Sequence, residues 1–167
     1  VAHSISVEAS VPKGGAEGVL ISMGGVDGGF SFYVQDGKLI YGYNYVADQR
    51  FKVQSDTAIP EGDHIFSFEF TPTGKADVAK GKGVPANIKL FVDGKQTGTG
   101  DLPVTIPISL GLAAGVCVGA DSGSPTMDTA YRAPYPFTGT VKKALVDVSG
   151  EAVEDMAARM KVYLSRQ

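Results

Sequence analysis

The sequence predicts an all-β fold: a two-sheet antiparallel sandwich of jelly-roll type, followed by one C-terminal amphipathic helix. Short apolar runs that alternate with polar residues recur over the first 148 positions, and the 22 glycines and 9 prolines fall mainly between them. The pattern changes to a helical period after Ser149. About ten short strands joined by hairpins and long loops are typical of a jelly roll. We therefore expect residues 1–148 to form one β-sandwich domain and residues 149–167 to form a helix packed on it.

The expected strands follow from the alternation and from turn signals. The clearest alternation places Phe66, Phe68 and Phe70 on one face, as in an antiparallel strand whose other face meets solvent. Asp-Gly pairs at 36–37 and 93–94 predict hairpins, because a type I′ turn needs positive φ at both central residues. The expected strands span residues 4–10, 19–23, 30–34, 39–45, 51–54, 65–70, 88–92, 95–100, 106–112, 115–120 and 137–148.

Residues after the last strand have the signature of a helix. Ser149 is a good N-cap, and the acidic side chains that follow favour the positive end of a helix. Apolar residues then recur at i, i+3, i+4 and i+7, which predicts one buried face. They are Val153, Met156, Ala157, Met160, Tyr163 and Leu164. We expect this helix to cover a sheet edge or to dock on a neighbouring domain. The segments 73–85 and 121–136 are expected to be long irregular connections.

Composition excludes several function classes. The net charge is −3, and the 15 basic residues form no cluster dense enough to neutralise a row of phosphates, so no nucleic-acid partner is expected. No apolar run approaches the roughly 20 residues of a membrane helix, so no membrane partner is expected. The single cysteine, Cys117, excludes an internal disulfide framework.

The chain lacks the usual sets of catalytic residues. It has two histidines and no Gly-x-Ser-x-Gly elbow, so a nucleophile with its base and orienting group is not evident. It also lacks the Glu-x-Asp-x-x-Glu run that places paired acids on a glucanase strand, and Glu69 has no acidic partner two to four residues away. We therefore expect no enzyme activity from this chain on its own.

One strand carries the richest candidate binding surface. Alternation places Tyr41, Tyr43 and Tyr45 on the same face. If that face is the core, the rings are packing residues, which is the interpretation we favour. If it is an open concave face, three rings could stack on a sugar, with polar neighbours binding its hydroxyls or a sulfate. Those neighbours are Asn44, Asp48 and Arg50.

Two further groups are candidates. Tyr131 and Arg132 lie in a proline-rich segment that could form a rigid contact surface, or could pack over the end of the sandwich. Asp121 and Asp128 lie in one loop, and Asp27 could join them as a calcium site if the loops meet. Such residues are also ordinary turn formers. No cofactor is expected other than this candidate calcium ion.

Several segments together are similar to a known family. The most specific are Val-Gly-Ala-Asp-Ser-Gly-Ser-Pro at 118–125 and Pro-Phe-Thr-Gly-Thr at 136–140, while Phe-Val-Asp-Gly-Lys at 91–95 also occurs in laminin-G-like domains. Over residues 18–148 the chain resembles the C-terminal domain of bacterial arylsulfatases. The resemblance implies a concanavalin A-like sandwich without catalytic residues, which packs on the sulfatase catalytic domain of the same or a separate chain.

The family's catalytic motif is absent here. In that family a Cys or Ser in a Cys/Ser-x-Pro-x-Arg motif of the preceding domain becomes formylglycine, whereas Cys117 is followed by Val-Gly-Ala. No catalytic or metal residue is carried over. The first hypothesis is thus an accessory domain of a sulfatase that helps to position a sulfated substrate, in a bacterial cytoplasm, periplasm or secreted protein.

Two hypotheses from other classes stand beside it. The second is a stand-alone carbohydrate-binding, lectin-like module that uses the tyrosine face; it predicts that Tyr43→Ala abolishes glycan binding without unfolding, and buried rings would contradict it. The third is a self-sufficient hydrolase.

Overall fold

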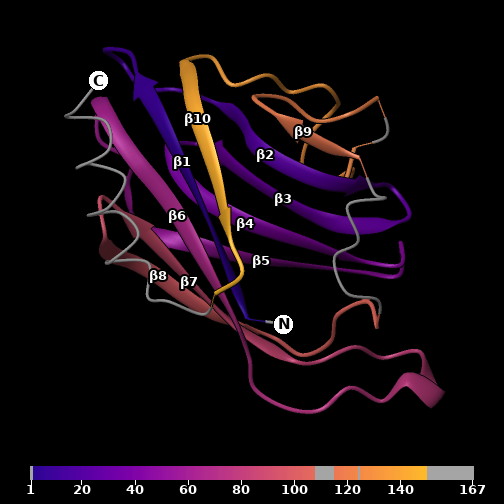
Figure 1. Cartoon of the computed structure of the whole chain (residues 1–167). Coiled ribbons are helices and arrows are strands. Elements are labelled where there is room, and N and C mark those ends of the chain that lie inside the picture. Colours follow the sequence, from indigo (N-terminus) through magenta and orange to yellow (C-terminus); the bar gives the residue numbers. More distant parts are fainter. Residues whose placement is uncertain (1, 108–114, 124, 150–167) are drawn as a thin grey trace.

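Two five-stranded antiparallel sheets form the protein in the computed structural model, which describes residues 2–107, 115–123 and 125–149. Sheet A contains, in spatial order, β10 (Thr140–Asp147), β1 (His3–Val11), β6 (Gly62–Pro72), β7 (Ala86–Val92) and β8 (Lys95–Leu102). Sheet B contains β5 (Gln49–Ala58), β4 (Lys38–Tyr45), β3 (Gly28–Gln35), β2 (Gly18–Gly25) and β9 (Val116–Val118). Figure 1 shows the two sheets as the layers of a sandwich. The predicted two-sheet antiparallel sandwich is confirmed.

The core lies between the sheets and is rich in aromatic rings. Phe68 of β6 is fully buried and makes edge-to-face contacts with Phe30 and Phe32 of β3, at centroid distances of 5.4 and 5.1 Å. Phe66 and Phe70 belong to the same core cluster, so the alternation in this strand predicted its inner face correctly. Burying one such side chain contributes about 1.5–3 kcal/mol, which makes these rings a large part of the driving force.

Both Asp-Gly pairs form the predicted tight hairpin turns. The φ angles are 52° at Asp36 and 75° at Gly37, and 53° at Asp93 and 81° at Gly94. All four are positive, as a type I′ turn requires. The first turn joins β3 to β4 and the second joins β7 to β8.

The outer face of sheet B is covered by the connection that follows β9. Met127 and Tyr131 of this connection pack on Tyr33 and Ile40, which point away from the main core, and form a second apolar cluster. Gly42 of β4 makes room for this cover, because a Cβ there would lie 2.7 Å from Cγ of Met127. The connection is irregular, as predicted, but it is packed on the sheet.

The two sides of the sandwich differ. On one side β5 and β8 approach closely: a Cβ on Gly98 would lie 2.6 Å from the carbonyl oxygen of Gln54. On the other side β9 and β10 are the outermost described strands of their sheets. Val118 of β9 and Val146 of β10 are about half exposed there.

Some predicted elements differ or lie outside the described residues. The 73–85 connection projects beyond the sheets (Figure 1) and contains the short 3-10 helix η1 (Val78–Lys80). Ile106 and Pro107 are not in a strand, and the rest of the predicted strand 106–112 lies outside the described residues. So do residues 150–167 of the predicted C-terminal helix. Across the described part of the chain, no helix has the length and apolar character needed to cross a bilayer.

Candidate binding site

The tyrosine face is part of the core. Tyr41 and Tyr43 are only 1% and 5% exposed and belong to the main apolar cluster, and Tyr45 packs against its rim. The Tyr43 hydroxyl accepts a hydrogen bond from the backbone N–H of Ile106 at 2.9 Å, and the Tyr45 hydroxyl donates one to the carbonyl of Gly81 at 2.7 Å. The interpretation as packing residues is the correct one. The first two rings are not available for stacking on a sugar, because sheet A lies over them.

Asn44 is a structural residue rather than a ligand-binding one. Its side chain is fully buried, and its amide donates hydrogen bonds to the carbonyls of Val26 and Thr126 at 3.0 and 2.9 Å. Its carbonyl oxygen accepts the backbone N–H of Ala47. Asn44 therefore ties together the β2–β3 turn, the β4–β5 turn and the loop over sheet B.

The remaining polar candidates lie on the surface but do not surround a common cavity. Arg50 forms a salt bridge with Asp128 at 2.8 Å and also donates to the carbonyl of Ala47. Asp48 and Arg132 are exposed. Because its guanidinium already has a carboxylate partner, Arg50 is not preorganised for a sulfate.

Asp121 and Tyr131 form a buried network. Oδ1 of Asp121 accepts hydrogen bonds from the Ser22 hydroxyl at 3.0 Å and from the backbone N–H of Ser122 at 2.7 Å. Oδ2 accepts the backbone N–H of Thr126 at 2.9 Å and the Tyr131 hydroxyl at 2.5 Å. Burial and this contact with Asp121 hold the pKa of Tyr131 well above its usual range, so the phenol keeps its proton.

The structure does not bring the three candidate calcium ligands together. The oxygens of Asp121 are satisfied by four protein donors, which is about the capacity of a carboxylate. Asp128 is paired with Arg50, and Asp27 is exposed in the turn between β2 and β3. Among the described residues no three His, Cys, Asp or Glu side chains are grouped as metal ligands would be.

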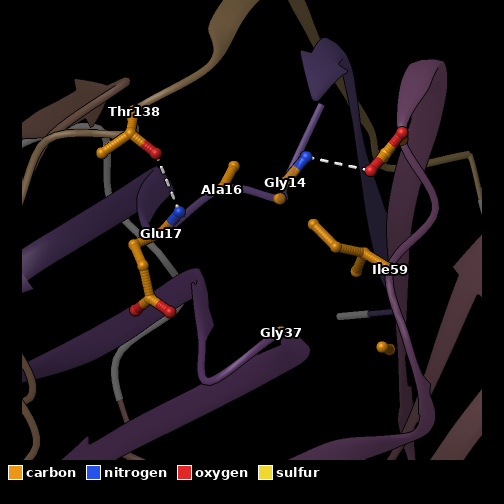
Figure 2. Close-up of a pocket in the computed structure, with 9 residues that line it drawn as sticks. Gly14, Ala16, Glu17, Gly37, Ile59 and Thr138 are labelled. Carbon is orange, nitrogen blue, oxygen red and sulfur yellow. Dashed lines mark hydrogen bonds between the residues drawn. The ribbon is translucent and has the colours of Figure 1, made fainter. Parts of the chain in front are cut away.

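A different region of the described surface is hollowed. One open pocket, with a volume of about 420 Å³, lies between the β1–β2 loop, the β3–β4 turn and the β5–β6 turn. In the view of Figure 2, Glu17 and Ile59 lie on opposite sides of this pocket. The residues that line it are Gly14, Gly15, Ala16, Glu17, Gly37, Ala58, Ile59, Glu61 and Thr138.

Hydrogen bonds hold Glu17 in place. Its carboxylate accepts the backbone N–H of Asp36 at 2.9 Å and the Tyr135 hydroxyl at 2.5 Å. Its own backbone N–H donates to the Thr138 hydroxyl at 2.9 Å (Figure 2). Burial and the contact with Glu17 raise the pKa of Tyr135, so this phenol remains a donor to the carboxylate. One wall of the pocket is thus rigid and negatively charged.

Glu61 supplies a second carboxylate from the opposite turn. It accepts the backbone N–H of Gly14 at 2.9 Å, which joins the β5–β6 turn to the β1–β2 loop. Glycines 14 and 15 have φ of 94° and 99°, a conformation that L side chains rarely adopt, and a Cβ on either would meet nothing within 4 Å. The described lining therefore combines two carboxylates, bare backbone and the apolar side chain of Ile59, with no basic side chain.

His64 holds the turn that carries Glu61. Its Nε2 lies 2.6 Å from the carbonyl oxygen of Glu61, and its Nδ1 lies 2.6 Å from Oδ2 of Asp93. Burial lowers the pKa of His64, but the hydrogen bonds to Asp93 and Glu61, with the charge of Asp93, outweigh it, and the net effect raises the pKa. The imidazolium form suits this position, because both ring nitrogens face acceptors.

Sequence reasoning missed this pocket. Its lining comes from distant segments of the chain, and the hydrogen-bonded Glu17 and Thr138 are 121 positions apart. The only local signals were the paired glycines at 14–15 and the Pro-Glu-Gly turn at 60–62. Such signals predict turns, and they do not say which turns meet.

Comparison with known proteins gives relatives of the fold only. No protein-family model matches the sequence, and no curated protein is significantly similar to it. Among solved structures, the heptameric SAP-like pentraxin from Limulus polyphemus is 14% identical with a TM-score of 0.53, over 93% of this chain and 69% of that one. Mouse laminin alpha1 domains LG4-5 are 13% identical with a TM-score of 0.58, over 90% of this chain and 36% of that one. The receptor binding domain of botulinum neurotoxin D is 10% identical with a TM-score of 0.56, over 95% and 37% of the two chains.

At these identities the likeness establishes the fold and no more. This chain spans little more than a third of the laminin and neurotoxin chains. None of the three structures links it to sulfatases, so that implication of the sequence resemblance stays a proposal. In fold, the chain is a jelly-roll β-sandwich like the domains of pentraxins and laminins.

Proposed function

We propose that this chain is a non-catalytic binding module that holds a neutral, hydroxyl-rich ligand, a glycan, in the pocket between residues 14–17, 37, 58–59, 61 and 138. The observation that carries the proposal is the lining of a pocket of about 420 Å³: one hydrogen-bonded carboxylate, Glu17, lies on one side, and a second, Glu61, lies on the turn that also carries the apolar side chain of Ile59. This volume lies within the range of roughly 300–1,000 Å³ that small-molecule sites occupy.

The chemistry of the lining suits sugar hydroxyls. Carboxylates accept short, strong hydrogen bonds from hydroxyl donors, and Glu17 and Glu61 are already oriented by protein donors. The C–H face of a sugar ring would pack on Ile59 and Ala58. A sulfate group would be repelled by both carboxylates, so the pocket favours an uncharged glycan over a sulfated one.

Structural neighbours support a binding role in general terms. One of them is the receptor binding domain of a neurotoxin, of which this chain covers 37%, so this fold occurs within at least one binding domain. Fold alone does not assign a ligand, and the ligand class here rests on the pocket.

The proposed lack of catalysis rests on the side chains. His64 is an unsuitable general base, because both of its ring nitrogens are engaged by acceptors. Each pocket carboxylate accepts a protein hydrogen bond, and Glu17 accepts two.

The binding proposal is tested by titrating the ¹⁵N-labelled chain with neutral, amino and sulfated sugars while amide chemical shifts are followed. A neutral glycan is expected to shift the amides of Gly14, Gly15 and Ile59. Ala58→Phe, which fills the pocket, is expected to weaken binding at least about tenfold, whereas Thr57→Phe at the exposed neighbouring position is the matched control. Shifts confined to Arg50 and Arg132, or no response to any sugar, would contradict the proposal.

A second candidate function is packing on a sulfatase catalytic domain. It is supported by the similarity of segments 118–125 and 136–140 to arylsulfatases. Apolar side chains on the outermost described strands also support it, since Val118 and Val146 are 52% and 54% exposed. An immunoblot of source-cell extract distinguishes the two functions. A band several times larger than 17.4 kDa supports an accessory domain joined to its catalytic domain in one chain, and a band near that mass contradicts that arrangement.

A further inference from the structure

The hydrogen bond between Glu61 and Gly14 depends on a turn that a histidine holds. Glu61 lies in the turn between β5 and β6, and its carboxylate accepts the backbone N–H of Gly14 at 2.9 Å beside the pocket (Figure 2). Nε2 of His64 lies 2.6 Å from the backbone carbonyl oxygen of the same Glu61. The side chain of Glu61 thus contacts the β1–β2 loop, while its backbone contacts the histidine.

An aspartate holds the other ring nitrogen of His64. Nδ1 lies 2.6 Å from Oδ2 of Asp93, and Oδ1 of Asp93 accepts the backbone N–H of Ile65 at 2.9 Å. The second of these contacts fixes the carboxylate in the β7–β8 turn. The ring therefore lies between two acceptors, a carboxylate and a carbonyl, and it can donate to both of them only as the imidazolium.

The other charges around His64 leave this arrangement intact. Asp63 precedes His64 on β6 and attracts its positive charge more weakly than Asp93 does, and Lys142 of β10 pairs with Asp63 at 3.1 Å. On the neighbouring strand β1, the register places the uncharged Ala9 opposite His64. Asp93 therefore supplies the charge in direct contact with the ring.

We infer that the pocket is coupled to pH through His64: the imidazolium holds the turn of residues 60–63, and with it the Glu61–Gly14 hydrogen bond, and loss of the ring proton releases both. A neutral imidazole has one N–H, and Asp93 retains it, because a hydrogen bond to a charged acceptor is the stronger one. The lone pair of Nε2 then faces the carbonyl oxygen of Glu61 at 2.6 Å, and the two acceptors repel each other. The turn moves away from the ring, and the carboxylate of Glu61 moves with it.

Little side-chain packing opposes this movement. Glu61, Gly62 and Asp63 are all exposed, and a Cβ on Gly14 would meet nothing within 4 Å. The consequence for binding rests on the proposed function. When Glu61 leaves its position, the pocket loses one of the two carboxylates that accept sugar hydroxyls, so its affinity for a neutral glycan is expected to fall as the pH rises.

A pH titration of the free ¹⁵N-labelled chain tests the coupling without a ligand. The ring of His64 and the backbone amide of Gly14 are followed by NMR, and both are expected to change with one midpoint, above the ordinary histidine pKa of 6.5. His3, at the opposite end of the β1–β6 pair, is the internal reference, and its own midpoint is not expected at Gly14. In His64→Gln, the amide of Gly14 is expected to lose this transition.

Asp93→Asn provides a matched variant that keeps the hairpin, because Asn-Gly is favoured in a type I′ turn. Without the carboxylate, the midpoints of His64 and Gly14 are expected to fall together by about half a pH unit or more. Asp128→Asn removes the same charge at the salt bridge with Arg50. This control is expected to change either midpoint by at most about 0.2 pH unit.

The effect on binding is measured with lactose, maltose and cellobiose as neutral probes at about pH 6 and about pH 9. A sugar that binds the wild type is expected to bind at least about threefold more weakly at the higher pH, and to bind His64→Gln with affinities that agree within about 1.5-fold. Failure of all three sugars to bind at either pH would count against the proposed function, while a shared midpoint of His64 and Gly14 would still support the coupling.

Three results would overturn the inference. An amide of Gly14 that does not follow the His64 midpoint would show that the ring does not control the turn. A midpoint that falls at His64 but not at Gly14 in Asp93→Asn would show that the two titrations are independent. Equal sugar affinity at both pH values in the wild type would show that the contact titrates without serving the pocket.

Discussion

Asp121→Asn is expected to lower the free energy of unfolding by about 2.5–6 kcal/mol. In the wild type, Oδ2 of Asp121 accepts hydrogen bonds from the backbone N–H of Thr126 and from the Tyr131 hydroxyl, and the site is buried. Asparagine can keep Oδ1 toward Ser22, but it turns Oδ2 into an NH₂ donor that faces two donors. The Tyr131 hydroxyl can rotate to accept, while the N–H of Thr126 cannot. The loss is one hydrogen bond to a charged group, about 1.5–3 kcal/mol, plus one buried unsatisfied N–H, about 1–3 kcal/mol.

Urea unfolding followed by circular dichroism measures this loss. The matched control is Asp128→Asn, which breaks a partly exposed salt bridge with Arg50 and is expected to cost at most about 1 kcal/mol. A loss below about 1 kcal/mol for Asp121→Asn would refute the structural role assigned to this carboxylate. So would a wild-type stability that falls in EDTA and returns with calcium, because binding of a cation at 100 times its Kd would add about 2.7 kcal/mol.

Three further predictions use the same unfolding assay. Tyr43→Ala is expected to lower the free energy of unfolding by about 3–5 kcal/mol, because it removes a ring from the core. A variant as stable as the wild type would contradict the placement of Tyr43 in the core. The wild type is expected to have a higher free energy of unfolding than His64→Gln. This difference should be largest below the ordinary histidine pKa of 6.5 and should disappear as the pH rises through the raised pKa of the folded state. A difference in the free energy of unfolding that is equal at pH 6 and pH 9 would refute this pH dependence. Gly18→Ala is expected to cost far more than Gly15→Ala: both have positive φ, but a Cβ at position 18 would lie 2.1 Å from the carbonyl oxygen of Pro136, and at position 15 it would meet nothing within 4 Å. Similar losses for the two alanines would contradict the close packing at Gly18.

The hairpins and strand faces were predictable because their causes are local. Asp36-Gly37 and Asp93-Gly94 set their turns through φ angles that depend on two adjacent residues. The alternation of Phe66, Phe68 and Phe70 follows from the two-residue period of a strand.

The role of the tyrosines depended on the tertiary structure. Alternation establishes that Tyr41, Tyr43 and Tyr45 share a face, whichever way the sheet is oriented. Only the second sheet, packed over that face, makes the first two of them core residues. Whether an aromatic face stacks on a sugar or on a phenylalanine is a property of its neighbour, and the local pattern does not contain the neighbour.

The role of Asp121 was likewise decided by tertiary contacts. Asp121 belongs to an Asp-Ser-Gly run. This sequence context is equally compatible with a turn residue, a calcium ligand and a buried hydrogen-bond acceptor. The structure selects the last, because Ser22 and Tyr131 approach it from distant parts of the chain.

The sequence by itself determined that this chain forms antiparallel strands joined by tight turns, since backbone geometry repeats every two residues and tight turns are coded by adjacent residues. Only the tertiary structure decided which loops meet at the pocket and which acids are satisfied by protein donors. Glu17 and Thr138 are hydrogen-bonded although they are 121 positions apart. Such long-range contacts follow from how the two sheets pack and how the connections fold over them, and no local sequence pattern carries that information.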